Sequence, residues 1–424
     1  MKNSPDKAKT IRTVFTAVLA AAVLLICGCG AKSDKTTAKI YITTDNGEGG
    51  SYGSALTKAD GNVSAHVIIC DPLGETIADD TEAKVKIRGN STSNGKKKPY
   101  QIKFSEKTDI LGMGECKKWI LLADFFDPTL MRNSLAMKMA KDFDLEGTPD
   151  YRRAELWFDG EYAGLYLLTE KIEADENRVN IDTKNGDFII EIDTPDRSEE
   201  EDINFYSEEF YFRVRDPDDP EKCDVPAIRE KVIELEEAMQ SGDYSSVLKL
   251  VDIDSFVNYY ILNEYLKPID FDKHSVYFYC KDGKFYAGPI WDYDLSCGNE
   301  NEMYSLMGPY ESAFDPELNF AKGCHFYRYL MKYPEFCEAV SKRYAGLKED
   351  GYFSSIYADD GWIVSETKKY RRAINRNNKL IDIGSQKILV MRNPDDTYEE
   401  NLTYLLNWLK VRDQAMEEYF KGEF

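Results

Sequence analysis

Histidine is nearly absent from this sequence, which has only three in 424 residues: His66, His274 and His325. A metal site built from several histidines is therefore nearly excluded, and a histidine-dependent catalytic triad has few candidates. Basic residues are also scarce, 54 against 76 acidic ones, and the net charge is −22. Such a chain repels phosphate backbones, so we expect no general nucleic-acid binding. Carboxylates and lysines remain to carry any chemistry.

The nine cysteines include no Cys-x-x-Cys pair, which disfavours a zinc ribbon. Cys27 and Cys29 end the N-terminal apolar run, and the other seven are an odd number spread along the chain. A full disulfide framework is therefore not expected, and we interpret these seven as single, mostly buried thiols.

The N-terminal apolar run, residues 14–26, is 13 residues long, too short to span a bilayer as a stable helix. It follows a basic leader and ends in Ile26-Cys27-Gly28-Cys29, which is typical of a bacterial lipoprotein signal peptide. We expect residues 1–28 to be the signal peptide, Cys29 to be lipidated and residues 29–38 to form a tether. The chain would then be exported and anchored to the outer face of the bacterial cell membrane. A plain or membrane-tethered signal peptide is the alternative.

Hydrophobic residues make up 42% of the chain and aromatic residues 13%, enough for a sizeable core. Alternating, β-branched segments dominate the first half, and helical periodicity dominates the second. We predict an α+β fold over residues 39–424, with a β-rich N-lobe at about 39–195 and a mainly helical C-lobe at about 225–424. An acidic, turn-rich stretch at 193–209 is interpreted as an exposed insertion, and a helix is predicted to start at Pro128. Strands are expected at 40–44, 63–70, 83–87, 100–104, 119–122, 154–158, 165–168, 188–192, 275–279 and 284–290, and further helices at 227–240, 253–266 and 402–420.

A polar, basic loop joins two of the predicted strands. It opens with Arg88-Gly89-Asn90-Ser91 and leads through Lys97-Lys98-Pro99 into the strand that carries Lys103. Loops of Gly, Asn and Ser can lay backbone N–H groups on phosphates. An ordinary hairpin loop with a solvated lysine cluster is the alternative.

Two aspartates, Asp292 and Asp294, follow closely behind a predicted strand. Side chains two residues apart at a strand end point the same way, so both can reach one hard cation. An all-oxygen ligand set favours Mg²⁺ or Mn²⁺. A capped strand end is the alternative. A glycosidase is disfavoured, because its two acids need a separation of several ångströms.

Several segments of the chain form a combined pattern. They are residues 84–92 (KVKIRGNST), 97–104 (KKPYQIKF), 131–133 (MRN), 161–172 (EYAGLYLLTEKI), 178–181 (RVNI), 263–265 (NEY), Asp270, 275–279 (SVYFY), 283–294 (GKFYAGPIWDYD) and 298–299 (GN). Together these segments resemble the CotH family of spore-coat protein kinases and their relatives. The resemblance runs from about Val85 to Asn299, with the helical tail as its continuation.

This resemblance implies an atypical, secreted protein kinase with a two-lobed, protein-kinase-like fold. Such an enzyme would transfer the γ-phosphate of ATP, with Mg²⁺ or Mn²⁺, to Ser or Thr of exported, cell-surface or coat proteins. We expect a monomer that meets the membrane only through its N-terminal lipid. A non-catalytic surface, adhesion or coat-assembly protein on the same fold is the alternative.

The resemblance also implies residue roles. Asp270 would orient or deprotonate the acceptor hydroxyl, with Asp272 as its rival. Ser275 stands five residues after Asp270, where a kinase has a metal-ligating Asn, and Asp292 and Asp294 would hold the metal. The helix after Pro128 has no Glu to pair with Lys103, so Glu155 or Glu170 would have to serve. The ATP-binding candidates are Arg88, Asn90, Ser91, Lys98, Lys103, Arg132 and Glu170.

Overall fold

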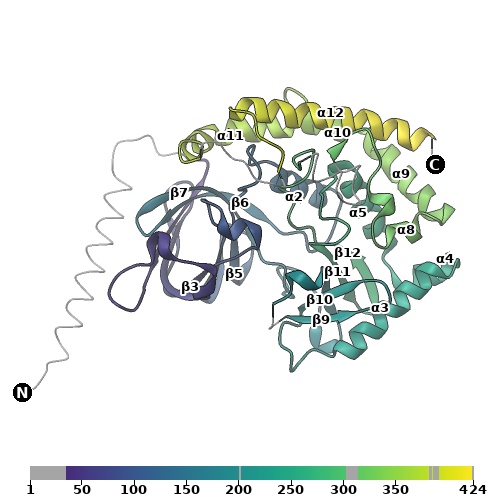
Figure 1. Ribbon diagram of the computed structural model, residues 1–424, viewed down its shortest axis with the longest axis horizontal. Coiled ribbons are helices and arrows are strands. Elements are labelled where there is room, and N and C mark those ends of the chain that lie inside the picture. The colour runs from purple at the N-terminus through teal and green to yellow at the C-terminus, as the bar shows by residue number, and fades with distance from the viewer. Residues whose placement is uncertain (1–34, 200–201, 302–313, 382–383, 385–390, 423–424) are drawn as a thin grey trace, which may run out of the picture.

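The computed structural model describes residues 35–199, 202–301, 314–381, 384 and 391–422 (Figure 1). The predicted signal peptide, Cys29 and the first part of the tether lie outside these residues. The described chain contains strands and helices, with a β-rich N-terminal region, as expected for an α+β protein. In Figure 1 a barrel lies at one end, a second sheet and most helices at the other, and α11 and α12 run along one side of both.

The N-terminal region is a closed barrel with strand order β1-β2-β3-β4-β5-β7-β6. Neighbours are antiparallel, except that β1 closes the barrel by pairing in parallel with β6. Alternate residues point inward, so that in β4 Tyr100, Ile102 and Phe104 are buried while Lys103 is exposed. The strands are β1 (Ala38–Thr44), β2 (Val63–Cys70), β3 (Thr76–Ile87), β4 (Tyr100–Asp109), β5 (Glu115–Leu122), β6 (Tyr151–Phe158) and β7 (Glu161–Glu170).

The hairpin of β6 and β7 has the tight turn that its Asp-Gly sequence predicts. Asp159 and Gly160 both have positive φ, 49° and 86°, as a two-residue turn of this hand requires. The Asp159 carboxylate also accepts the backbone N–H groups of Thr44 (2.7 Å) and Gly53 (2.8 Å). This one residue therefore shapes the hairpin and ties it to the start of the barrel.

A second sheet has the order β12-β11-β8-β10-β9 and joins strands from both halves of the chain. Its centre is the antiparallel pairing of β8 with β11, so the predicted lobe boundary near residue 195 cuts through it. The stretch 193–209 is not simply an exposed insertion, because it contains β9, whose Phe205 is buried. The strands are β8 (Phe188–Ile192), β9 (Ile203–Tyr206), β10 (Tyr211–Asp216), β11 (Val276–Lys281) and β12 (Lys284–Ala287).

The helices confirm most of the predicted periodicity, but the helix expected at Pro128 begins at Arg132. The Asp127 carboxylate accepts the N–H groups of Thr129, Met131 and Arg132, which stabilises a turn instead of a first helical turn. The helices are α2 (Arg132–Asp142), α3 (Val225–Gln240), α4 (Tyr244–Leu250), α5 (Ile253–Leu266), α8 (Tyr327–Leu330), α9 (Pro334–Glu349), α10 (Tyr352–Tyr357), α11 (Trp362–Asn377) and α12 (Tyr398–Gly422). Short 3₁₀ helices are η1 (Gly53–Ala55), η2 (Lys58–Asp60), η3 (Ser91–Asn94), η4 (Thr183–Asn185), η5 (Pro195–Arg197) and η6 (Ala321–Gly323).

Buried polar contacts hold the two regions together. In α11, Asn377 accepts the N–H of Leu165 from the barrel (3.0 Å), and Arg376 pairs with Glu155 (2.6 Å). In the helical region, Arg412 of α12 pairs with Glu264 of α5, and both side chains are fully buried. These contacts fix the barrel end relative to α5 and the loops around it.

No disulfide joins the seven cysteines of the described residues, and five of them are buried, as the sequence predicts. No helix in this part of the chain combines the length and hydropathy needed to cross a membrane.

Candidate active site

Asp292 and Asp294 lie in the segment that follows β12. The strand ends at Ala287, earlier than predicted, and a cis Gly288–Pro289 bond follows. The aspartates therefore project from an anchored loop instead of a strand end. Tyr293 between them is buried: its N–H donates to Asn133 (2.8 Å) and its hydroxyl to Asn263 (2.7 Å).

The carboxylates of this loop accept no hydrogen bond from the described residues. Asp294 is buried, and no donor among the described residues is hydrogen-bonded to its carboxylate. Lost hydration raises its pKa well above the usual range, and the nearby Asp292, Asp124, Asp127 and Asp270 add to the effect.

Asp292 shows the same effect, although its side chain is open to solvent. Enough protein surrounds it that lost hydration, followed by the charge of Asp270, raises its pKa to about 6, against the opposing charges of Arg88 and Arg197. The charge of Asp270 thus acts on both Asp292 and Asp294, although it comes from a different loop.

This group can bind a cation. Bringing a positive charge to clustered carboxylates removes their mutual repulsion and replaces lost hydration. Across the described residues, no group of three or more His, Cys, Asp or Glu side chains is arranged as a metal site. Two protein carboxylates are nonetheless what Mg²⁺ uses when substrate phosphates and water complete its coordination.

Arg88 brings a cation from the barrel to this loop. Its guanidinium lies 4.9 Å from the centre of the Trp291 ring, and its Nη1 is buried without a hydrogen-bond partner in the described chain. Burial lowers its pKa, while the charges of Tyr277, Asp292 and Glu191 oppose that effect. A buried donor without a partner beside a carboxylate loop is suited to receive an anion.

Asp270 lies in the turn between α5 and β11. The turn is fixed by its own backbone: Ile269 donates to Leu295 (3.1 Å), and Lys273 and His274 donate to the Asp270 carbonyl (3.0 and 2.8 Å). The rival Asp272 accepts the N–H of His325 (2.8 Å), so its carboxylate has a structural partner. Ser275 is half-buried with a φ of 57°, directly before β11.

Other predicted residues make contacts elsewhere. Lys103 is exposed on the outer face of β4, and the Nζ of Lys98 donates to the Leu56 carbonyl (2.8 Å). Glu170 pairs with Arg178 (2.6 Å) and Glu155 with Arg376, so the prediction that one of them pairs with Lys103 is wrong.

Asn90 and Ser91 lie exposed at the start of η3. Asn90 accepts a hydrogen bond from Lys58 (3.3 Å). Both residues remain accessible to a ligand.

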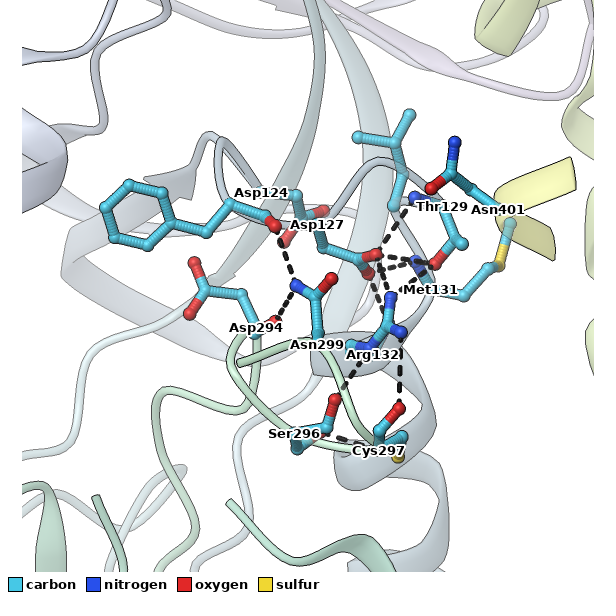
Figure 2. A network of polar contacts seen from close by, with 12 residues as sticks. Asp124, Asp127, Thr129, Met131, Arg132, Asp294, Ser296, Cys297, Asn299 and Asn401 are labelled. Carbon is cyan, nitrogen blue, oxygen red and sulfur yellow. Dashed lines mark hydrogen bonds and ion pairs between the residues drawn. The ribbon is translucent and has the colours of Figure 1, made fainter. Parts of the chain in front are cut away.

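Arg132 is the centre of a buried network (Figure 2). Its guanidinium pairs with Asp127 (2.6 Å) and donates to the carbonyls of Ser296 (2.8 Å) and Cys297 (3.4 Å). These partners contradict the prediction that Arg132 contacts phosphate. It instead joins the start of α2 to the chain that follows Asp294.

Asn299 completes this network. Its amide donates to the carbonyls of Phe126 and Asp294, both at 2.7 Å, and no dashed line in Figure 2 reaches the Asp294 carboxylate. Asp124 is held similarly by Arg153 (2.8 Å) and Asn133 (2.9 Å). Asn299, Asn133 and Arg132 thus hold the backbone at and around Asp294, while the Asp294 carboxylate has no such contact and can bind a ligand.

Sequence reasoning missed three features of this region. Asp124 and Asp127 carry no motif that marks them as partners of Arg153 and Arg132. Lys97, one residue from a predicted lysine, is the buried member of its cluster: it donates to the Leu165 carbonyl, and burial lowers its pKa to about 7. Arg197 lies 3.9 Å from Asp270 but belongs to the acidic, turn-rich stretch 193–209, which carries no motif for a residue of the site.

The geometry therefore combines a carboxylate loop suited to a cation, a half-buried arginine whose unpartnered donor is suited to an anion, and a third carboxylate, Asp270, from a second loop. In the comparison with known families, residues 85–416 match the family described as CotH kinase protein. The chain belongs to this CotH family. No curated protein matches it significantly.

Proposed function

We propose that this protein is a secreted, lipid-anchored protein kinase with a two-lobed, protein-kinase-like fold. It transfers the γ-phosphate of ATP to Ser or Thr of exported, cell-surface or coat proteins. The observation that carries the proposal is the convergence of Asp270, Asp292 and Asp294 beside the unpartnered donor of Arg88. The carboxylates of Asp292 and Asp294 accept no hydrogen bond from any described residue.

These residues fit a nucleotide with its divalent cation. Asp292 and Asp294 would hold Mg²⁺ or Mn²⁺, which neutralises charge on the phosphates. Arg88, fixed on Trp291, binds an oxygen of the phosphate chain, and Asn90 and Ser91 lie where the same loop can contribute further.

Asp270 orients the acceptor hydroxyl and takes its proton as the new P–O bond forms. The anchored backbones of the two loops keep these groups in place, so little reorganisation is needed during transfer. The mature chain reaches its substrates from the membrane surface through the lipid on Cys29, without further subunits.

The test uses the purified mature chain with γ-labelled ATP, Mn²⁺ or Mg²⁺, and Ser-rich acceptor proteins. We expect label on the acceptor or on the chain itself. The absence of label, together with no ATP-dependent thermal shift, would contradict the kinase function and favour a non-catalytic surface protein. Globomycin should separately leave the precursor unprocessed in cells, and normal processing would contradict the lipid anchor.

A further inference from the structure

A short arm, residues 193–199, connects the two sides of the candidate site. On one side Asp193 contacts His274 (3.1 Å), four residues after Asp270. On the other side Glu199 pairs with Lys58 (2.8 Å), whose Nζ also donates to Asn90 in the predicted phosphate loop (3.3 Å). The arm therefore spans from the turn of Asp270 to the loop of the barrel.

The backbone of this arm is anchored at Arg197. Its carbonyl accepts a hydrogen bond from Arg213 of β10 (2.8 Å), and Arg213 is itself paired with Asp193 and Asp202, both at 3.1 Å. A residue in an acidic surface stretch is thus held by a buried arginine. Such support positions a side chain more precisely than a free loop does.

The Arg197 side chain points at the reacting region. Its Nη1 lies 3.9 Å from the Asp270 carboxylate, and it is also among the charges that act on Asp292. At 3.9 Å the contact with Asp270 is too long for a hydrogen bond. The side chain is 35% exposed, so an ion pair of this kind adds little to stability.

We propose that Arg197 is a catalytic residue that contacts the phosphoryl group during its transfer. This inference rests on the proposed kinase function. In the step, the acceptor oxygen forms a bond to the γ-phosphorus, the bond from that phosphorus to the β-bridging oxygen breaks, and the acceptor proton passes to Asp270. A guanidinium that lies next to Asp270, and whose charge also acts on Asp292, is suited to bind the equatorial oxygens of the phosphoryl group as it passes from ADP to the acceptor, and so stabilises the transition state.

The experiment measures steady-state phosphorylation by wild type, Arg197→Ala and Arg197→Lys. We expect Arg197→Ala to lower kcat by about 100-fold or more, with the KM for ATP changed by less than about threefold. Arg197→Lys should retain part of the rate, and added guanidinium ion should partly restore Arg197→Ala. The matched control is Arg371→Ala, which removes a similarly exposed ion pair with Glu399 on α11 and α12 and should leave the rate unchanged.

Each other outcome has a defined meaning. An Arg197→Ala variant with normal or increased kcat would overturn the inference, an increase indicating that the contact with Asp270 is inhibitory. A rise only in the KM for the acceptor would overturn it in favour of substrate recognition. A wild type that transfers no phosphate would refute the kinase function and this inference with it, whereas an active wild type beside an active Arg197→Ala refutes this inference alone. Thermal melting of each variant checks that folding is intact.

Discussion

Two pairs of aspartates lie close together in this molecule and have opposite surroundings. Asp124 and Asp127, before α2, are buried, and each is paired with an arginine and with further donors. Asp292 and Asp294, after β12, have no hydrogen-bond donor among the described residues and have raised pKa values. The same residue type thus serves structure in one segment and is left available for a ligand in the other.

Asp124 and Asp127 help to hold Asp292 and Asp294 in place for a ligand. Arg132, held by Asp127, fixes the carbonyls of Ser296 and Cys297, and Asn133, held by Asp124, accepts the N–H of Tyr293. The paired aspartates therefore stabilise the backbone on which the unpaired ones lie. They also add negative charge near Asp294, which increases its tendency to bind a cation.

The largest effect is expected from Asp294→Asn. Phosphoryl transfer should fall by about 1,000-fold or more, because the residue that would hold the metal loses its charge. The melting temperature should be equal to or above that of wild type, because an unpaired buried carboxylate is removed. Asp79→Asn, on the barrel surface, is the control and should change neither quantity. An active Asp294→Asn would refute the metal assignment.

Asp127→Asn should have the opposite profile. It leaves Arg132 buried without its charged partner, which costs about 3 kcal/mol of folding free energy. Urea denaturation of the variant and of wild type measures this cost. Activity at low temperature, where the variant is folded, should fall far less than in Asp294→Asn. Unchanged stability would mean that this pair does not have the structural role given to it.

The sequence predicts much of this comparison but not all of it. Two predictions from local sequence are confirmed: the tight Asp-Gly turn between β6 and β7, and the bounds of α5. The strand before Asp292 and Asp294 ends earlier than predicted, so these aspartates lie on a loop. Barrel closure by β1 and β6 and the pairing of β8 with β11 join residues about a hundred positions apart, which local patterns do not encode.

The same limit applies within the site. The alternation of a strand puts Lys103 on the face opposite Ile102 and Phe104, and the structure shows its side chain exposed there. The resemblance to kinases instead led to the prediction that Lys103 binds ATP. The partners of Glu170 and Arg132 depend on tertiary pairing, and no residue spacing shows that Arg178 or Asp127 reaches them first.

Divalent cations should distinguish the two pairs by thermal stability. Mg²⁺ or Mn²⁺ at about 100 times its dissociation constant should stabilise wild type by about 2.7 kcal/mol, a rise in melting temperature of about 3 °C. Asp292→Asn and Asp294→Asn should lose this shift, and Asp79→Asn should keep it. A full shift in the first two variants would place cation binding elsewhere.

The smallest effect on activity is expected at Glu300, a carboxylate that lacks a partner among the described residues but is not part of the candidate active site. Glu300 is fully buried, and both of its oxygens lack a hydrogen-bond partner in the described chain. Lost hydration raises its pKa from 4.5 to about 7, against the charges of Lys267 and Arg132. Because the pKa of Glu300 is higher in the folded state than in the unfolded state, ionisation of Glu300 costs no folding free energy below pH 4.5. Above that pH this residue lowers the folding stability progressively, until the loss is complete just above pH 7.

The substitution Glu300→Gln should remove the loss of folding stability that ionisation of Glu300 causes at neutral and higher pH. The variant should match wild type near pH 4 and exceed it by about 3 kcal/mol at pH 8 in urea denaturation, while its phosphotransfer rate stays within about threefold of wild type. A loss of activity as large as that of Asp294→Asn would extend the reactive region to Glu300. Equal stability of the two proteins at pH 8 would show that the buried carboxylate has a partner in solution, and the comparison would then keep only Asp292 and Asp294 as unpaired acids.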